Sequence, residues 1–316
     1  MSSTPEISIA AKRLRKSYGD KVVLDGIDLT VRAGTIFSLL GPNGAGKTTT
    51  VQILSTLIRP DGGTARVEGH DLGRAPDAVR TAIGVTGQFA AVDRLLTGEE
   101  NLLLMADLHH LDRARGRRRT AELLERFDLV EAAKRLPATY SGGMRRRLDL
   151  AMTLVGSPQL IFLDEPTTGL DPRSRQTMWE IIRELADSGV TIFLTTQYLE
   201  EADQLANRIA VLHNGKLAAE GGPDELKRLI PGGHVRLRFA DEHALLAAMR
   251  LLGHSVRGED GLSLRVPSDC RVRSLRMLLD ELDDAGVEAE EFSVNTPDLN
   301  DVFFALTDSK REVLSA

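Results

Sequence analysis

The chain has 316 residues and carries 40 Lys and Arg against 46 Asp and Glu, a formal net charge of −6 at pH 7. This length exceeds one typical hydrophobic core and predicts a large domain with a smaller one. The acidic balance argues against a general nucleic-acid-binding protein, which needs a basic face to neutralise phosphates.

Nothing in the sequence predicts direct insertion into a membrane. Residues 1–6 are polar and lack the apolar stretch of a secretory signal. No apolar run approaches the roughly 18 residues of a transmembrane helix. Cys270 is the only cysteine, which excludes an intramolecular disulfide and fits a reducing, cytosolic location. We therefore expect membrane contact only through a partner.

The first predicted elements are strands. Residues 7–31 alternate apolar and polar side chains around a turn at Tyr18-Gly19-Asp20, which is typical of antiparallel strands. Residues 35–40 form a short apolar run suited to a buried strand, and residues 49–57 carry apolar side chains at helical spacing.

Between that strand and that helix lies Gly41-Pro42-Asn43-Gly44-Ala45-Gly46-Lys47-Thr48, which fits the phosphate-binding pattern G-x-x-x-x-G-K-[ST]. The glycines permit positive φ and let backbone N–H groups curl around an anion, at the positive end of the following helix. Lys47 would bridge the β- and γ-phosphates, and the Thr48 hydroxyl would bind Mg²⁺. The flanking strand and helix disfavour an accidental glycine-rich turn, so we expect ATP or GTP binding.

The next segment is predicted to be largely helical. Strands are expected at residues 64–68 and 83–86, the second running into Gly87-Gln88, and a helical, charged region at residues 97–136. A basic run in this region is interpreted as a solvated helix face rather than a docking surface for phospholipid or a partner; it comprises Arg113, Arg115, Arg117, Arg118 and Arg119.

A further helix is predicted to start after Ser141. This serine is a natural N-cap, and Gly142 and Gly143 leave backbone N–H groups free to approach a ligand. Because serine and glycine are common at helix starts, these residues alone favour an ordinary cap over a binding site.

Residues 160–163 form an apolar run that ends in Asp164-Glu165-Pro166, which is typical of a buried parallel strand carrying acids to the ligand-binding edge of a sheet. Asp164 is predicted to hold Mg²⁺, directly or through water, and Glu165 to polarise the attacking water. The elements expected next are a turn at 169–172, a helix at 174–187, a strand at 190–195 leading to Gln197, and a strand at 209–212 with a hairpin turn at Asn214-Gly215.

In this order, the pieces resemble the ATP-binding subunit of an ATP-binding cassette (ABC) transporter over about residues 7–229. The resemblance implies that Gly41–Thr48 is the Walker A loop, Asp164-Glu165 the end of Walker B, and Ser141–Gly143 the signature. The nucleotide contacts that it implies are Tyr18 (on adenine), Asn43, Gly44, Ala45, Gly46, Lys47, Thr48, Thr49, Gln88 (the Q-loop), Ser141, Gly142, Gly143 and Asp171 (the D-loop). The implied metal contacts are Thr48, Gln88 and Asp164.

The resemblance also implies an assembly. Two cassettes of this family pair head to tail, so Ser141 and Gly143 would contact the ATP held by the Walker loops of the partner. The implied fold is an α/β P-loop cassette with a RecA-like core, an antiparallel β subdomain and a helical subdomain at about residues 90–157. The implied cofactors are ATP and Mg²⁺, and the implied partners are a second cassette, with a homodimer expected, and an integral membrane permease at the cytoplasmic face of the cell membrane.

One departure from the family pattern concerns catalysis. Gln197 stands where most members carry histidine, and an amide donates a hydrogen bond to the γ-phosphate but cannot take a proton near neutral pH. We therefore assign the proton transfer to Glu165 and the substrate, with Lys47 and Gln197 completing the predicted catalytic set.

Residues 141–151, residues 194–206 and the C-terminal extension resemble the daunorubicin/doxorubicin-resistance ATPases. This resemblance implies export of an amphipathic drug, antibiotic, lipid or glycolipid. A nucleotide-gated subunit with negligible turnover and a soluble non-transport ABC ATPase are the alternatives.

The cassette is predicted to end near residue 230, where glycine and proline interrupt the pattern. Residues 231–316 predict the order β-α-β-β-α-β of a ferredoxin-like α+β domain, with its last strand at residues 287–294. A final helix with an exposed Phe303-Phe304 pair is predicted to follow. No catalytic or metal-binding pattern is found there. We expect this domain to be regulatory or dimerising.

Overall fold

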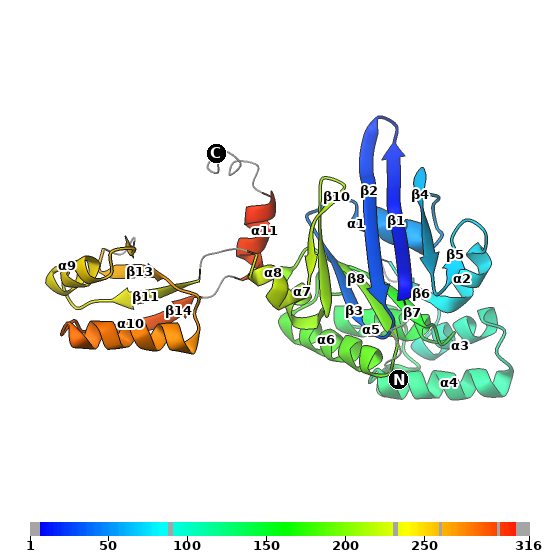
Figure 1. Ribbon diagram of the computed structural model, residues 1–316. Coiled ribbons are helices and arrows are strands. Elements are labelled where there is room, and N and C mark those ends of the chain that lie inside the picture. The colour runs from blue at the N-terminus through cyan, green and yellow to red at the C-terminus, as the bar shows by residue number, and fades with distance from the viewer. Residues whose placement is uncertain (1–6, 88–90, 230–232, 259–260, 296–297, 308–316) are drawn as a thin grey trace, which may run out of the picture. The chain divides into compact units, whose positions relative to one another are not determined.

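The computed structural model describes residues 7–87, 91–229, 233–258, 261–295 and 298–307. The chain divides into two compact units, Met1–Pro223 and Asp224–Ala316 (Figure 1). None of the helices within the described ranges has both the length and the apolar character needed to cross a bilayer.

The first unit begins with an antiparallel sheet of strand order β2-β1-β4-β5. Its strands are β1 (Ile7–Tyr18), β2 (Lys21–Arg32), β4 (Gly62–Val67) and β5 (His70–Asp71). The predicted hairpin is confirmed: β1 and β2 meet at a turn in which Gly19 has a φ of 56°. Alternating side chains of β1 and β2 are buried, as expected for a sheet with one face on a core.

The second sheet places the predicted phosphate-binding and acidic segments at the same end of two parallel strands, with one strand between them. Its strand order is β10-β9-β3-β8-β7-β6, and it is parallel except for β10. The strands are β3 (Ile36–Leu40), β6 (Ile83–Thr86), β7 (Leu160–Asp164), β8 (Thr191–Thr196), β9 (Arg208–His213) and β10 (Lys216–Gly221). Every residue of β3, β7 and β8 is buried, because both faces of these strands are covered.

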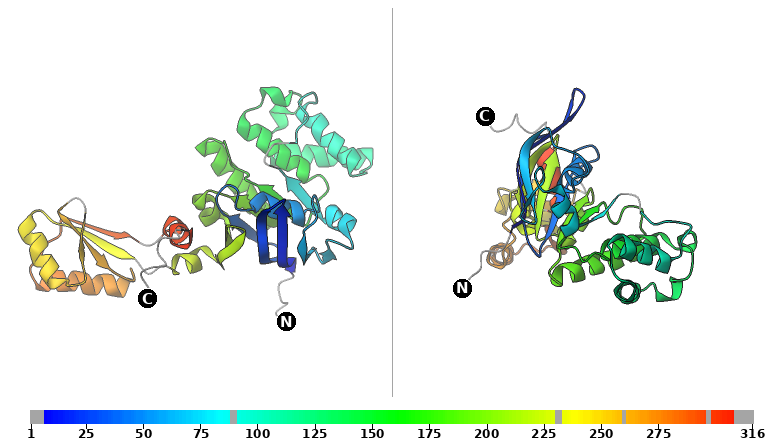
Figure 2. Two further views of the ribbon diagram at one scale, coloured as in Figure 1. Left: turned by 90° about the horizontal axis from the view of Figure 1, so that it is seen from above. Right: turned by 90° about the vertical axis from the view of Figure 1, so that its right-hand side faces the viewer.

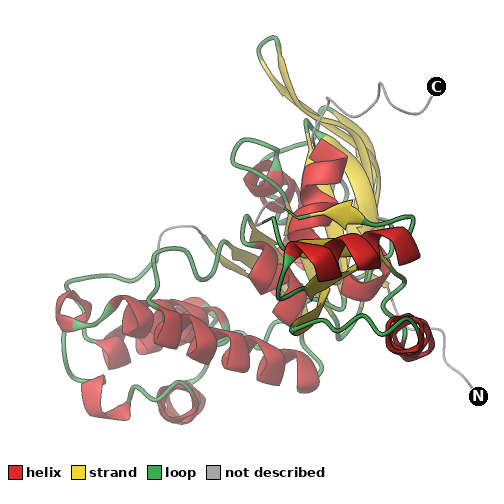
Figure 3. Ribbon diagram, turned by 90° about the vertical axis from the view of Figure 1, so that its left-hand side faces the viewer, coloured by secondary structure: helices red, strands yellow, loops and turns green. Residues whose placement is uncertain are grey.

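Helices cover this sheet and also form a group of their own. The helices beside the sheet are α1 (Lys47–Leu54), α2 (Pro76–Ala82), α6 (Pro172–Asp187) and α7 (Leu199–Leu205). The separate group contains α3 (Gly98–Leu108), α4 (Arg113–Arg126) and α5 (Gly142–Thr153). In Figure 2, α3 and α4 (teal) lie side by side, away from the antiparallel sheet. Figure 3 shows a group of helices that extends away from the yellow strands.

The predicted helical region over residues 97–136 consists of two separate helices, α3 and α4. The chain turns at His110, whose φ is 55°, and Asp112 then caps α4 through the N–H groups of Ala114 and Arg115. Between α4 and α5 the chain forms two 3₁₀ turns, Val130–Ala132 and Pro137–Thr139. The Asp112 carboxylate accepts from two N–H groups that have no partner within the helix, and this fixes the start of α4.

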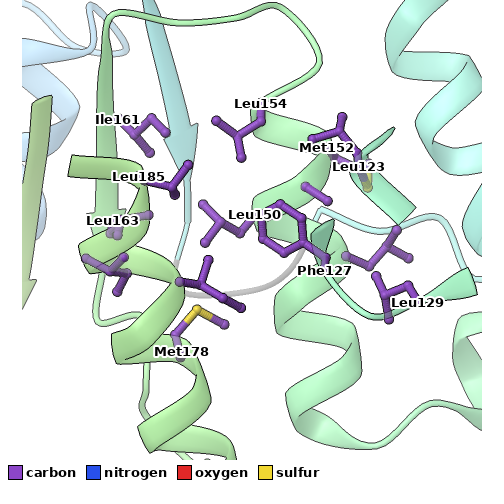
Figure 4. Close-up of a cluster of buried hydrophobic side chains, with 14 of the residues drawn as sticks. Leu123, Phe127, Leu129, Leu150, Met152, Leu154, Ile161, Leu163, Met178 and Leu185 are labelled. Carbon is purple, nitrogen blue, oxygen red and sulfur yellow. The ribbon is translucent and has the colours of Figure 1, made fainter. Parts of the chain in front are cut away.

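A shared core joins the helical group to the parallel sheet. Figure 4 shows Phe127, which follows α4, Leu150 of α5 and Met178 of α6 packed among neighbouring apolar side chains, with Ile161 and Leu163 of β7 in the same cluster. Helix α5, which begins at the predicted signature, therefore packs in one core with the strand that carries Asp164.

The second unit has the predicted β-α-β-β-α-β order. Its elements are β11 (His234–Arg238), α9 (Glu242–Leu251), β12 (Val256–Arg257), β13 (Ser263–Pro267), α10 (Val272–Asp284) and β14 (Glu291–Asn295). The sheet order β12-β13-β11-β14 is antiparallel throughout and is that of a split βαβ domain. Helices α8 (Pro223–Lys227) and α11 (Leu299–Thr307) flank it in sequence.

Two details of this unit differ from expectation. The last strand was predicted from residue 287 but starts at Glu291, because Val287 still bonds back to Leu282 of α10. The aromatic pair on α11 is not uniformly exposed: Phe304 is 63% exposed, whereas Phe303 is half-buried.

Candidate functional site

The phosphate-binding loop lies between β3 and α1, and its glycines are required by its geometry. Gly46 is the N-cap of α1 with a φ of 110°, and a Cβ there would lie 2.7 Å from Leu24 Cδ2 and 2.9 Å from the Val23 carbonyl oxygen. Gly44 has a φ of 81°, and Asn43 and Gly44 are exposed. The loop therefore presents its backbone to solvent at a helix N-terminus.

The loop lysine lies against the predicted catalytic acid. Lys47 Nζ donates to the carbonyl oxygens of Gly41 at 2.8 Å and Pro42 at 3.2 Å. It also lies 3.3 Å from Glu165 Oε1, and the two side chains are only 5% and 9% exposed. Residues that are 118 positions apart in sequence thus form one charged pair beside the loop.

The acids sit where β7 ends. Asp164 is buried and accepts a short hydrogen bond from Thr195 Oγ1. Glu165 has a φ of 50°, a conformation that costs free energy for a residue with a Cβ. Its N–H donates to the Thr195 carbonyl at 3.1 Å, and Thr168 Oγ1 donates to Oε2 at 3.3 Å. One bond to the neighbouring strand β8 and one from the loop that follows β7 thus hold the strained residue with its carboxylate toward Lys47.

The remaining Walker A side chains lie in the loop just before α1 and at the first turn of that helix. Ala45 is buried, Thr48 is exposed and Thr49 is half-buried. A threonine hydroxyl and the Asp164 carboxylate are oxygen donors of the kind that Mg²⁺ prefers, so the residues present fit that ion.

Gln197 lies directly after β8, and this strand end is tied to the loop. The Gly41 N–H donates to the Thr196 carbonyl at 3.2 Å. The Gln197 side chain is half-buried. Gln88, the other predicted glutamine, lies outside the described residues.

Tyr18 stands apart from these contacts, at the end of β1. Its ring is 50% exposed, and Lys16 Nζ lies 5.6 Å from the ring centroid. An exposed aromatic face is available for stacking on a base.

The signature residues form a second cluster with the predicted D-loop acid. Ser141 caps α5 by accepting from the Met144 N–H at 3.2 Å. Asp171 caps α6 by accepting from the Ser174 N–H at 3.0 Å and Ser174 Oγ at 2.6 Å. Gly143 packs on that cap, since a Cβ on it would lie 2.6 Å from Ser174 Oγ.

Each cluster is thus assembled on one chain, but the two remain separate. Among the described residues, no hydrogen bond or ion pair links Lys47 or Glu165 to residues 141–143. Ser141 and Gly142 are exposed, so the N-terminus of α5 faces solvent. Its unpaired N–H groups are free to bind an anion supplied from outside the chain.

Sequence reasoning missed Glu201, which lies beneath the catalytic segment. This α7 residue is fully buried and accepts from Thr167 Oγ1 at 2.7 Å and Trp179 Nε1 at 3.2 Å. Burial raises the pKa of its carboxyl, while hydroxyl and indole donors oppose the shift. A glutamate in an otherwise amphipathic helix offers no signal that it will be buried, so only the packing of α6 on α7 shows its role.

Replacing Glu201 with glutamine is expected to reduce the pH dependence of the free energy of unfolding. Because the folded-state pKa is raised, the contribution of this carboxyl is full below its unfolded pKa and is lost as pH rises through the folded pKa. The wild type should therefore lose more stability than the variant between about pH 5 and about pH 8. Urea unfolding at both pH values measures this, with exposed Glu184→Gln as control; parallel pH profiles would contradict it.

The fold and the two clusters define a nucleotide-binding cassette of the ABC class. The sequence pattern of the ABC transporter family matches residues 24–168. The chain is 49% identical to the daunorubicin/doxorubicin resistance ATP-binding protein DrrA of Streptomyces peucetius, over 97% of this chain and 94% of that protein. It therefore belongs to the ABC transporter ATP-binding family, and it is an ATP-binding, ATP-hydrolysing subunit.

Two further similarities cover the cassette. The chain is 43% identical to the Nod factor export ATP-binding protein I of Paraburkholderia xenovorans (strain LB400), over 70% of this chain and 73% of that protein. A dimeric ATP-binding cassette, solved in a post-hydrolysis state with ADP and Pi bound, matches with a TM-score of 0.62 and 25% identity, covering 68% of this chain and 98% of that chain.

Proposed function

We propose that two copies of this chain pair head to tail around two molecules of Mg-ATP and power a separately encoded membrane permease. In each composite site, Walker A and Walker B come from one copy and the signature cluster from the other. The chain would then act at the cytoplasmic face of the membrane, held there by the permease.

The observation that carries this proposal is the division of the site into two clusters. Lys47 and Glu165 form one charged pair, while Ser141 stands exposed at the open N-terminus of α5. The second cluster offers the N–H groups at the N-terminus of α5 to a phosphate but has no lysine. The first cluster has the lysine but not the N–H groups of α5. A second copy of the chain would bring the missing group to each cluster. The similar cassette that was solved with ADP and Pi is itself dimeric.

Each site residue has an assigned role in this proposal. Glu165 is the group that polarises the attacking water, and Lys47 and Gln197 contact the γ-phosphate. The exposed Tyr18 ring stacks on adenine, with the Walker A backbone and Thr49 around the phosphates. Mg²⁺ would be held by Thr48 and Asp164, with Gln88 as a further contact, and would neutralise charge on the phosphates.

The substrate class is proposed from the relatives. Proteins named for daunorubicin/doxorubicin resistance and for Nod factor export are similar to this chain. We infer export of an amphipathic compound, a drug, antibiotic or lipid-like molecule. ATP binding would close the dimer and hydrolysis would open it, and the permease would convert this cycle into alternating access.

Reconstitution with the permease tests this function. In inverted membrane vesicles that contain both subunits, daunorubicin is expected to stimulate ATP hydrolysis several-fold and to accumulate in the lumen only when ATP is present. Vesicles that carry the permease with the Lys47→Ala chain provide the control, because that lysine is the only Walker A cation. Accumulation of the compound without ATP, or in the control vesicles, would contradict a motor role for this chain.

A further inference from the structure

A buried ion pair lies within α5, and the scheme above does not use it. Arg146 Nη1 lies 3.3 Å from Asp149 Oδ2, and the side chains are 11% and 4% exposed. Asp149 Oδ1 also accepts from the Ala91 N–H at 2.9 Å. Desolvation lowers the pKa of Arg146 and raises that of Asp149, and their mutual attraction opposes both shifts. The pair therefore lies inside the unit, where each side chain is the nearest opposite charge to the other.

The same guanidinium reaches three backbone carbonyls outside its helix. Arg146 Nη2 donates to the Asp164 carbonyl at 3.1 Å, and Nε donates to the Pro166 carbonyl at 2.9 Å. These two carbonyls flank Glu165. Arg146 Nη1 donates to the Gly87 carbonyl at 2.8 Å, directly before Gln88. One side chain therefore joins the signature helix to the catalytic segment and to the start of the Q-loop.

Only an arginine can make this set of bonds. Its planar fork carries five N–H donors in fixed directions, whereas the lysine ammonium offers three donors at a single point. A buried ion pair contributes little net stability compared with apolar residues of the same size. The pattern of acceptors on both sides of Glu165 therefore points to positioning as the reason for the pair.

We propose that Arg146, oriented by Asp149, is a positioning residue that couples the signature helix to hydrolysis. It fixes the backbone on either side of Glu165 and so sets the direction of the catalytic carboxylate. This inference rests on the proposed function, in which the N-terminus of α5 binds the ATP of the partner. A shift of α5 on binding that ATP then moves Glu165 of its own chain, which links the two composite sites of the dimer.

Arg146→Lys tests the inference because it keeps the charge and removes the fork. The expected result is a fall of about tenfold in kcat for ATP hydrolysis, since small misplacement of a catalytic group is costly. The KM for ATP should stay within about twofold, because Arg146 contacts no Walker A residue. Asp149→Asn keeps the Arg146 guanidinium but removes the charge that orients it. This variant should likewise lower kcat and leave the KM for ATP nearly unchanged.

The matched control is Arg147→Lys on the same helix. Arg147 bonds to Asp128 at 3.0 Å and to the Phe127 carbonyl at 2.8 Å, both within the helical group. This variant makes the same Arg-to-Lys change one position away, at a side chain whose two bonds both come from Nη1 and do not reach the catalytic segment, and it should turn over at the wild-type rate. A loss in Arg147→Lys equal to that in Arg146→Lys would overturn the inference.

A double variant separates positioning of Glu165 from a general loss of structure. In single-turnover assays, Arg146→Lys should slow the wild type about tenfold but add no further loss to Glu165→Gln, because residues that act as a unit are non-additive. The same fold loss in both backgrounds, or wild-type turnover by Arg146→Lys, would overturn the inference. Wild-type turnover by Glu165→Gln alone would instead contradict the proposed function.

Discussion

Replacing Glu165 with glutamine is expected to lower the steady-state ATPase rate by about 100-fold or more, the usual contribution of a general base. The amide keeps the shape of the side chain and an oxygen that can accept from Lys47, which lies 3.3 Å from Glu165 Oε1. Nucleotide binding should therefore survive. Because the variant binds ATP without hydrolysing it, the two copies should stay together.

The trapped dimer is detected by cross-linking across the composite site. In a Cys270→Ser background that carries Glu165→Gln, one preparation receives Asn43→Cys and the other Ser141→Cys, both at exposed positions. When the two are mixed with Mg-ATP, a disulfide-linked dimer is expected on a non-reducing gel. Neither preparation alone should give this product, because each composite site would then contain only one of the two thiols.

The control for geometry is a thiol away from the proposed interface. Val130→Cys lies in the helical group and is 61% exposed, and mixed with Asn43→Cys it should give no cross-link. A product of equal yield without ATP, or with the Val130→Cys partner, would count against the head-to-tail dimer. Turnover of Glu165→Gln at the wild-type rate would remove Glu165 from its assigned role.

Gly143→Ala should reduce ATP hydrolysis by about 100-fold, as expected when phosphate-contacting groups move by about 1 Å. An added Cβ would lie 2.6 Å from Ser174 Oγ, a distance that real Cβ atoms do not adopt. The N-terminus of α5 must then move away from α6, which displaces the donors at Ser141. Binding of ATP to the chain's own Walker A loop should be unchanged, because the atoms nearest to the added Cβ all belong to Ser174.

The chain offers a direct rescue of this variant. Ser174→Gly removes both side-chain atoms that the new methyl group would meet, and its Cα lies 3.9 Å from the Cβ position. The double variant Gly143→Ala/Ser174→Gly is therefore expected to recover most of the lost rate, whereas Ser174→Gly alone should have a small effect. Failure of the double variant to recover would show that the clash is not the cause.

The site motifs were recognisable because each lies within a few consecutive residues. The loop from Gly41 to Thr48 is a contiguous pattern between a strand and a helix, and both flanking elements are present in the structure. The apolar run before Asp164 likewise forms the predicted strand. In the second unit, the spacing of the apolar residues and the positions of the glycines were enough to predict the order of strands and helices. The sheet order agrees with that prediction.

The predicted and observed helix boundaries differ where a local sequence pattern allows two conformations. Residues 97–136 have helical composition throughout, but His110 adopts a left-handed conformation and Asp112 begins a new helix. Helix α6 was predicted from residue 174 and begins at Pro172, because Asp171 takes the capping position. Proline at the first helical position and an acid before it were the available signals.

Local residue order was thus sufficient for the class of protein, the nucleotide loop and the acidic pair, since these depend on backbone conformations set by near neighbours. It could not place Lys47 against Glu165, bury Glu201 beneath Thr167, or bring Arg146 to carbonyls 18, 20 and 59 positions away. Those contacts depend on which strands become neighbours and on how α5 packs over them. Side chains distant in sequence meet only after the sheet and helices have assembled, because burial of the apolar core, and not local propensity, sets that geometry.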